Sequence, residues 1–210
     1  MNITNEDNME LMARYEDNYF DLAIVDPPYG KRPTRGDNGF GSPNTRKFSS
    51  KDDKWDVRPT KAYFNELKRV SKHQIIWGFN YFINYLEPSN AIIVWDKMNG
   101  KNPYADCELA WSNYTKTVKK FSLLWLGSHC KDTGGLIHPT QKPVKLYEWL
   151  LMNYANKGDK ILDTHLGSGS IAIASHNLGY DLTACELDTE YYNAAIKRIQ
   201  KHKQQLRIAI

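Results

Sequence analysis

Residues 21–30 read DLAIVDPPYG, and this stretch predicts a buried strand that ends in a stiff turn. Residues 22–25 are apolar throughout and are bounded by turn-forming residues, which is typical of a strand inside a sheet. The two prolines fix the backbone after the strand and hold Asp26 in an extended conformation. In open α/β sheets ligands bind at the carboxyl ends of the strands, so Asp26 and Tyr29 are candidates to hold a flat, hydrogen-bonding ligand. A capped strand with an ordinary proline turn is the alternative interpretation.

A second stretch, KILDTHLGSGS at residues 160–170, indicates a strand that runs into a glycine loop just before a helix. Glycines let the backbone approach a ligand closely, and the N-terminus of a helix adds free N–H groups. The next expected strand ends in ACELD, which puts Glu186 about twenty residues after the loop. An acid at that position of a nucleotide-binding α/β unit can accept hydrogen bonds from both ribose hydroxyls. One small chain thus carries two separate strand ends that suit ligand binding.

The rest of the chain alternates between strands and helices after an amphipathic lead-in at residues 3–20. Apolar runs predict strands at residues 21–26, 73–79, 91–97, 107–114, 119–127, 160–163 and 181–188. Helical spacing predicts helices at residues 60–72, 80–88, 144–158, 171–179 and 189–206, with Thr60 and Asp188 as N-cap candidates. Residues 107–114 and 119–127 could pair as a hairpin. This alternation predicts an α/β fold with a doubly wound, mostly parallel sheet.

The overall composition fits a single domain that spans residues 1–210. Hydrophobic residues make up 41% of the chain, which is enough for a core, and no stretch resembles a membrane span or a signal peptide. The three cysteines, Cys107, Cys130 and Cys185, have the spacing of neither a zinc site nor a disulfide framework. We therefore expect reduced thiols in a cytoplasmic protein that holds no metal.

Positive charge is concentrated in one part of the chain, although the net charge is only +4. Residues 31–72 carry twelve lysines and arginines against five acidic residues. Within this segment, residues 30–60 are rich in glycine, proline, serine and charge, which predicts a long mobile loop. A basic loop of this kind suits a polyanionic partner, and a solvated basic surface is the alternative.

Three segments resemble the signature sequences of S-adenosylmethionine-dependent DNA amino-methyltransferases: DPPYG at residues 26–30, HPTQKP at 138–143 and DTHLGSGS at 163–170. Their order resembles the β class, in which the Rossmann-like methyltransferase fold is circularly permuted and the catalytic segment precedes the cofactor loop. The glycine segment of the family usually reads Asp-Pro-Phe-x-Gly-Ser-Gly-Thr. This chain departs from it with Thr164 and His165 in place of Pro and Phe, and with Ser170 in place of the final Thr.

The resemblance implies S-adenosyl-L-methionine as cofactor and an exocyclic amine of double-stranded DNA as methyl acceptor. Asp26 and the carbonyl of Pro27 would accept the two amino hydrogens. Pro28 would stiffen the turn, and Tyr29 would stack on a base that has left the helix. The residues implied to contact the cofactor are Asp163, Gly167, Ser168, Gly169, Ser170 and Glu186 around the glycine loop, and His138, Thr140, Gln141 and Lys142 in the HPTQKP segment. Such a transfer needs positioning and electrostatics and no metal.

Simpler roles compete for several of these residues. Lys142 could be a helix-start lysine in water, and His138 and His165 could be buried structural histidines. Two further strand ends, residues 77–80 (Trp-Gly-Phe-Asn) and 95–97 (Trp-Asp-Lys), belong either to the target pocket or to the core.

Four functions stay open at this point. The leading Asp of the DPPY segment favours an adenine N6 methyltransferase, and a cytosine N4 enzyme would use the same chemistry. A non-catalytic methylase relic and an NAD-binding dehydrogenase are the other two, although the glycine loop lacks the full G-x-G-x-x-G pattern of the latter. Residues 113–137 are too few for the large target-recognition domain that is usual in the family. Without such a domain some other surface must hold the DNA, and a second copy of the chain could supply it. The resemblance also implies a role in restriction-modification, whereas the sequence leaves open whether a restriction partner exists.

Overall fold

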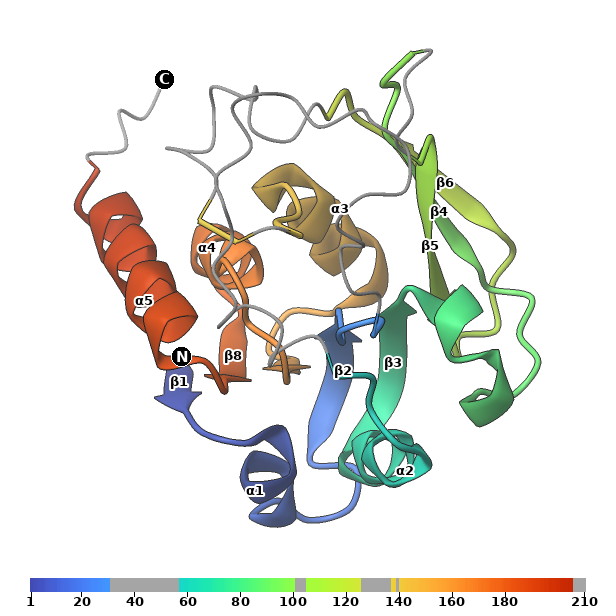
Figure 1. The fold of residues 1–210 in the computed structure, drawn as a ribbon, viewed down its shortest axis with the longest axis horizontal. Helices are drawn as coiled ribbons and strands as arrows, with labels where there is room; N and C mark the ends of the chain where they lie inside the picture. The colour runs from blue at the N-terminus through green and yellow to red at the C-terminus, as the bar shows by residue number, and fades with distance from the viewer. Residues whose placement is uncertain (31–56, 101–104, 126–136, 139, 206–210) are drawn as a thin grey trace.

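The computed structural model describes residues 1–30, 57–100, 105–125, 137–138 and 140–205. These residues form a sheet of eight strands with helices on both faces, as Figure 1 shows. The strands are β1 (Asn2–Asn5), β2 (Phe20–Val25), β3 (Ser71–Trp77), β4 (Ile93–Asp96), β5 (Cys107–Ser112), β6 (Lys119–Ser122), β7 (Lys160–Asp163) and β8 (Asp181–Glu186). The helices are α1 (Asn8–Ala13), α2 (Lys61–Val70), α3 (Val144–Tyr154), α4 (Ser170–Leu178) and α5 (Thr189–Gln204). Most of the predicted basic loop, residues 31–56, lies outside the described residues.

The sheet has the strand order β1-β8-β7-β2-β3-β5-β4-β6. All neighbouring pairs are parallel except those that β5 makes with β3 and β4, so β5 alone runs against the rest. In the centre of the sheet β2 lies between β3 and β7, with Leu22 paired to Ile161. Segments far apart in the sequence therefore end side by side. The predicted α/β fold with a mostly parallel sheet is confirmed, whereas circular permutation stays a prediction.

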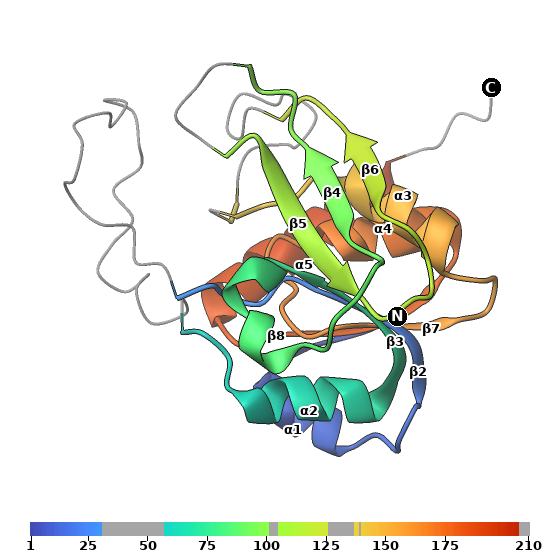
Figure 2. The same cartoon turned by 90° about the vertical axis from the view of Figure 1, so that its right-hand side faces the viewer.

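The two faces of β2 bury different cores because successive side chains point to opposite sides of a sheet. Leu22 and Ile24 pack with residues of α3, α4 and α5, and Ala23 and Val25 pack with residues of α1 and α2. Figure 2 shows these two helical layers on either side of the sheet. Both faces of the central strands are covered, which explains why they read as continuous apolar runs.

The predicted helix after the basic loop is confirmed as α2. Its buried residues are Tyr63, Phe64, Leu67 and Val70, the apolar face expected from the spacing. Thr60 stands at the N-cap position but its side chain makes no capping hydrogen bond. Asp188 does cap α5, since its carboxylate accepts hydrogen bonds from the N–H groups of Glu190 and Tyr191.

The structure corrects three local predictions. The lead-in forms β1 and α1, and β1 pairs with β8 at the sheet edge. Residues 79–85 form two short 3₁₀ turns, η2 (Phe79–Tyr81) and η3 (Ile83–Tyr85), instead of a helix. The predicted hairpin between residues 107–114 and 119–127 is wrong, because β4 lies between β5 and β6. β4 supplies the buried Ile93 and Trp95, so it takes the inner place and leaves the more exposed β6 at the edge.

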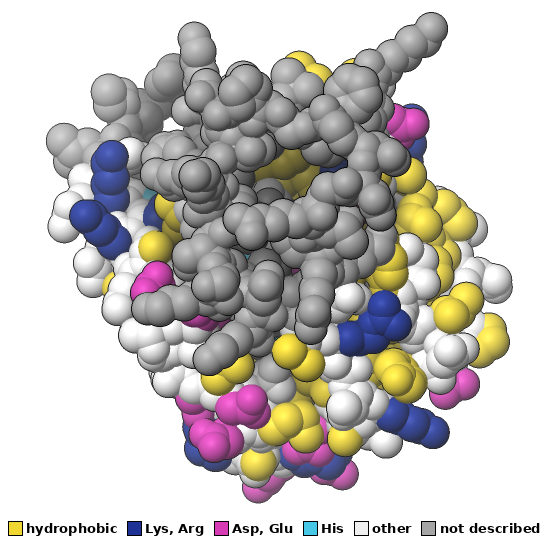
Figure 3. Space-filling view, viewed as in Figure 1, with side chains coloured by type: hydrophobic (Ala, Val, Ile, Leu, Met, Phe, Trp, Pro, Cys, Tyr) yellow, Lys and Arg dark blue, Asp and Glu magenta, His cyan; other side chains and the backbone are white. Residues whose placement is uncertain are grey.

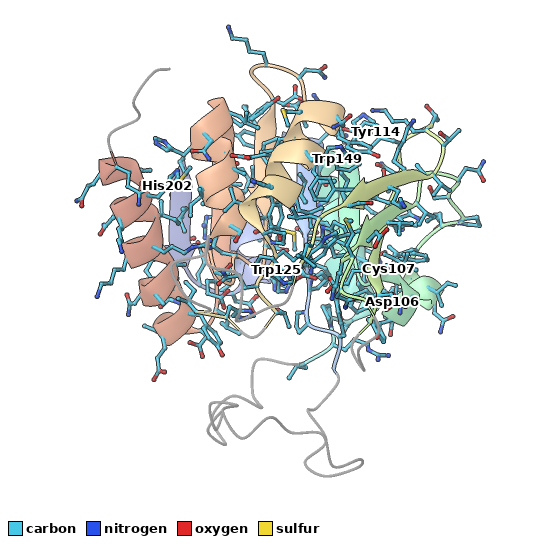
Figure 4. The ribbon with its side chains drawn as sticks, turned by 90° about the horizontal axis from the view of Figure 1, so that it is seen from above. Asp106, Cys107, Tyr114, Trp125, Trp149 and His202 are labelled. Atoms are coloured by element: carbon cyan, nitrogen blue, oxygen red, sulfur yellow. The ribbon has the colours of Figure 1, made fainter. Side chains whose placement is uncertain are left out.

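Helix α3 extends the core over the β4–β6 part of the sheet. The Trp149 ring packs on Phe121 of β6 with ring centroids 5.4 Å apart, and the Tyr114 hydroxyl donates a hydrogen bond to the carbonyl of Tyr154. Trp149 and Tyr114 are labelled in Figure 4. On the surface over α1 and α2, acidic and basic side chains are interspersed, as the lower part of Figure 3 shows. Arg69 pairs there with Glu66 and Asp17. Among the described residues no helix is long and apolar enough to cross a membrane.

Candidate active site

A cavity of about 670 Å³ lies where the carboxyl ends of the central strands meet. It brings together both ligand-binding stretches predicted from the sequence. Predicted site residues that line it are Asp26, Pro27, Pro28, Tyr29, His138, Thr140, Gln141, Lys142, Gly167, Ser168, Ser170 and Glu186. A second cavity, of about 760 Å³, is lined by residues such as Lys68, Lys72 and Lys116 and by none of the predicted site residues. We take the first cavity as the candidate active site because the chemistry converges there.

Two predicted cofactor residues lie just outside the cavity lining. Asp163 is buried at the end of β7, where its carboxylate accepts a hydrogen bond from the N–H of His165. Burial raises the pKa of Asp163 to about 8. Gly169 faces α5, because a side chain there would meet Ile199 at 3.0 Å. Gly169 therefore allows α5 to pack closely against the glycine loop.

The carboxylate of Asp26 is the best-connected group of the cavity. One oxygen accepts a hydrogen bond of 2.7 Å from the Tyr29 hydroxyl, and the other accepts one from the ammonium group of Lys142. The side chain of Lys142 is only 3% exposed, so it is no solvated helix-start lysine. Burial raises the pKa of Asp26, and the positive charge of Lys142 opposes this shift. The DPPY segment thus presents an acceptor whose orientation two donors fix.

The ring of Tyr29 is held against the short turns after β3. It stacks on Tyr81 with centroids 4.8 Å apart and an interplanar angle of 19°. Gly78 lies so close that a side chain on it would come within 2.1 Å of the Tyr29 ring. Of the two further strand ends considered from the sequence, Trp77 and Trp95 are buried core residues. Asp96 instead pairs with Lys120 at the exposed sheet edge.

The glycine loop and the end of β8 are joined through Glu186. Its carboxylate accepts hydrogen bonds from the N–H groups of Gly167, at 2.8 Å, and Asp188, at 3.0 Å. Gly167 has a φ of +53°, a conformation that favours glycine. Arg198 of α5 holds the loop from behind, donating to the carbonyl of Ser168 and to the hydroxyl of Ser170. The loop is therefore fixed from two sides.

Polar side chains line the cavity beside the glycine loop, at two of the three positions that depart from the family pattern. The Tyr63 hydroxyl lies 2.7 Å from that of Thr164, which lies 2.9 Å from Nδ1 of His165. Nε2 of His165 lies 3.2 Å from the amide nitrogen of Asn8. Burial lowers the pKa of His165 to about 3 and that of His138 to about 4, so both rings are neutral at pH 7. His165 thus has a structural role with one edge on the cavity.

Sequence reasoning missed two groups of residues at this site. The first comes from the lead-in, where Glu6, Asp7, Asn8 and Met9 line the cavity. Asp7 accepts a hydrogen bond from the N–H of Met9, so a capping acid before an apolar run was the available signal. The second is Glu108 on β5, 3.1 Å from the ammonium group of Lys142. Nothing in the local sequence distinguishes Glu108 from a surface acid.

The sequence of this chain is similar to those of several known proteins. The N6/N4 methyltransferase family, described as DNA methylase, matches residues 51–197. The type II methyltransferase M2.DpnII of Streptococcus pneumoniae is 28% identical over 127 residues, which are 60% of this chain and 47% of that protein. M.HpaI of Haemophilus parainfluenzae is 26% identical over 238 aligned positions, covering 91% of this chain and 71% of that one. The chain therefore spans about half the length of the first relative.

Solved structures share the fold at low sequence identity. M1.HpyAVI, crystallised as a complex with SAM, superposes with a TM-score of 0.60 at 19% identity, covering 94% of this chain and 98% of that one. The cytosine-N4-specific PvuII DNA methyltransferase gives 0.61 at 13% identity, covering 96% of this chain and 89% of that one. The family match extends over more than half of the sequence and includes the cavity segments HPTQKP and DTHLGSGS. The chain belongs to the N6/N4 DNA methylase family.

Proposed function

We propose that this protein transfers a methyl group from S-adenosylmethionine to an exocyclic amine of a base extruded from double-stranded DNA, with adenine N6 as the target. The observation that carries the proposal is the single cavity that joins the Asp26–Tyr29 turn to the glycine loop and Glu186. Its volume of about 670 Å³ lies within the range of ligand pockets. The proposed acceptor pair and the expected cofactor loop thus line the same cavity.

The chemistry of the cavity fits this cofactor. Glu186 uses one lone pair of each carboxylate oxygen on backbone N–H groups, which leaves acceptor capacity for ribose hydroxyls. The carboxylates of Glu6 and Asp7 also line the cavity and suit a ligand with positive charge. When bound, S-adenosylmethionine supplies an electrophilic methyl group carried on a sulfonium.

The chain's own contribution to the transfer is positioning. An exocyclic amine is a poor nucleophile because its lone pair is delocalised into the ring of the base. Asp26 and the carbonyl of Pro27 accept its two hydrogens, which favours a pyramidal nitrogen with the lone pair pointing outward. Tyr29 and Lys142 each occupy one lone pair on Asp26, so its carboxylate keeps the capacity for an amino hydrogen. Preorganised groups of this kind lower the barrier without rearranging during the reaction.

Cytosine N4 is the second candidate target, because the same acceptor pair serves either amine. The similarity to the cytosine-N4-specific PvuII enzyme concerns the fold, and it does not distinguish adenine from cytosine as the target base of this chain. The Asp at the start of the DPPY segment favours adenine. Double-stranded DNA is both the proposed partner and the proposed substrate.

The test is incubation of the protein with methyl-labelled cofactor and DNA of mixed sequence, followed by digestion to nucleosides. We expect label in N6-methyladenine. Label in N4-methylcytosine would correct the target base. The Asp26→Ala variant serves as control and should bind cofactor as the wild type does while transfer falls on the order of a hundredfold or more. Transfer by wild type and Asp26→Ala at equal rates would overturn the proposed role of Asp26.

A further inference from the structure

Glu108 contacts Lys142 of the candidate active site although none of the predicted site segments includes it. It stands on β5, the reversed strand, with a side chain that is 25% exposed. One carboxylate oxygen lies 2.7 Å from the ammonium group of Lys97 and the other 3.1 Å from that of Lys142. Since Lys142 in turn contacts Asp26, four charges of alternating sign run from Lys97 to the proposed acceptor of the amine.

The two lysines of this row of charges lie over the rings of buried tryptophans. The ammonium group of Lys142 lies 5.4 Å from the centroid of the Trp77 ring, and that of Lys97 lies 5.2 Å from the Trp95 ring. The two tryptophans are fully buried and meet edge to face. Charges above buried rings are poorly screened, so each one depends strongly on its neighbours.

We propose that Glu108 is a positioning residue for methyl transfer, which holds Lys142 charged and in place so that Lys142 fixes the Asp26 carboxylate as an ionised acceptor. The inference rests on the proposed function. Two contacts carry it: a lysine almost without exposure to solvent bridges two carboxylates, and one of these carboxylates is the acceptor itself.

The physical need for Glu108 follows from burial. A buried Asp26 favours its protonated form, which would donate a hydrogen bond where the amine requires an acceptor. Lys142 offsets this effect only while it is charged, yet burial lowers its pKa. Asp26 and Glu108 together more than reverse that shift, so the pKa of Lys142 lies above its ordinary value. The negative charge of Glu108 by itself raises the pKa of Asp26, so Glu108 favours the ionised acceptor only through Lys142. The other titratable groups near this pair are Tyr29 after β2, His138 in the HPTQKP segment, Tyr147 on α3 and Asp163 at the end of β7.

The test compares Glu108→Gln with Glu148→Gln. Glu148 on α3 is a matched control because it too is a partly buried acid in a polar contact, a hydrogen bond from Asn177, and it does not line the cavity. We expect Glu108→Gln to reduce the rate of transfer about tenfold or more at saturating substrates, on the scale of losing one preorganised contact, with unchanged cofactor affinity. The melting temperature should fall because Lys142 loses a buried counter-charge, so the rates are compared at a temperature where both variants are folded. Glu148→Gln should keep the wild-type rate. Equal rates in both variants and the wild type would overturn the inference.

A double-mutant cycle tests whether Glu108 acts through Lys142. In a Lys142→Met background, Glu108→Gln should cause little further loss of rate, because the group it positions is gone. Additive losses would contradict the proposed relay. The alkaline limb of the pH–rate profile should lie at lower pH for Glu108→Gln than for the wild type. The reason is that Lys142 loses one of its two counter-charges and therefore loses its proton at a lower pH.

An NMR titration of the Lys142 side-chain nitrogen separates this inference from the proposed function. The pKa of Lys142 should fall in Glu108→Gln and stay at the wild-type value in Glu148→Gln, whether or not methyl transfer is detected. An unchanged Lys142 titration would overturn the inference while leaving the proposed function intact. Absence of transfer by wild type on any DNA, with the titration shift present, would overturn the function alone.

Discussion

Gly78 shows how the lack of one side chain sets the geometry of the acceptor. Its φ of +67° favours glycine, and a methyl group on it would come within 2.1 Å of the Tyr29 ring. We expect Gly78→Ala to displace Tyr29, to break its hydrogen bond to Asp26 and to lower the transfer rate at least about tenfold, on the scale of losing one preorganised contact.

Gly100→Ala is the matched control for this change. Gly100 has a similar φ of +70°, and no described atom lies within 4 Å of the position its side chain would take. Gly100→Ala should therefore cost only the backbone strain, about 1–2 kcal/mol of unfolding free energy, and leave the rate unchanged. Steady-state kinetics and thermal melts of both variants measure the difference. Equal rates would show that Tyr29 tolerates displacement.

Asp163 predicts a pH dependence of stability. Its pKa is about 8 in the folded protein, above the ordinary value of 3.8, so between these limits the folded state holds a proton that the unfolded chain has lost. Stability therefore falls as the pH rises through this window, by up to about 1.4 kcal/mol per pH unit. Asp163→Asn, which keeps an acceptor for the N–H of His165, should be more stable than wild type at pH 8 and similar to it near pH 4.

Urea unfolding at several pH values tests this expectation, with Asp106→Asn, a change at an exposed aspartate, as control. A stability difference between Asp163→Asn and wild type that stays constant from pH 4 to 8 would contradict it.

At the scale of single elements, α5 supports the glycine loop from behind. Arg198 is partly buried and donates to the Ser168 carbonyl and the Ser170 hydroxyl. We expect Arg198→Ala to weaken cofactor binding about tenfold, because charged hydrogen bonds contribute about 1.5–3 kcal/mol and part of this loss reaches the loop. Lys197→Ala, at the exposed neighbouring position of the same helix, should bind as wild type does. Calorimetric titration with S-adenosylmethionine measures both, and equal affinities would confine Arg198 to a role in stability.

Elements with strong periodicity were predictable from the sequence, and those that depend on distant partners were not. α2 follows from four apolar residues on one helical face, and β2 follows from its apolar run. β1 is only four residues long and becomes a strand because β8 offers it an edge. Likewise, local sequence cannot show that β4 separates β5 from β6, since this order depends on which strand buries more apolar surface.

The same division holds for the candidate site. Asp26, the glycine loop and Glu186 were predictable because each ends a strand in a motif with its own chemistry. Glu108 and Asn8 were not, because their partners Lys142 and His165 are distant in the sequence and meet them only in the folded chain. Their contributions are properties of the assembled fold.

At the scale of the whole molecule, the proposed DNA substrate requires a basic surface that binds phosphates. Residues 31–56 lie outside the described part of the chain, and their excess of basic residues makes them the proposed contact. Changing Arg32, Arg35, Arg46 and Lys47 to Ala should weaken DNA binding and flatten its salt dependence, by about one unit of slope per lost phosphate contact.

DNA affinity measured across a salt series tests this proposal. The comparison variant carries Lys197→Ala, Lys201→Ala and Lys203→Ala on the exposed side of α5. An unchanged slope in the loop variant together with a reduced slope in the α5 variant would move the interface to α5. An unchanged slope in both would require another surface of the molecule, such as one contributed by a second copy of the chain.

The central place of β2 has a consequence for how the protein is made. The ribosome releases the Asp26 turn early, yet the strand beside it, β7, exists only after residue 160 has been synthesised. A nascent chain therefore carries the acceptor for a long time with one edge of β2 unpaired, and it can neither bind cofactor nor modify DNA. Such an edge also invites wrong pairing with other chains. We therefore expect cofactor binding and the proposed methyl transfer only after β7 and β8 have been synthesised, and products truncated before β7 should be inert and prone to aggregate.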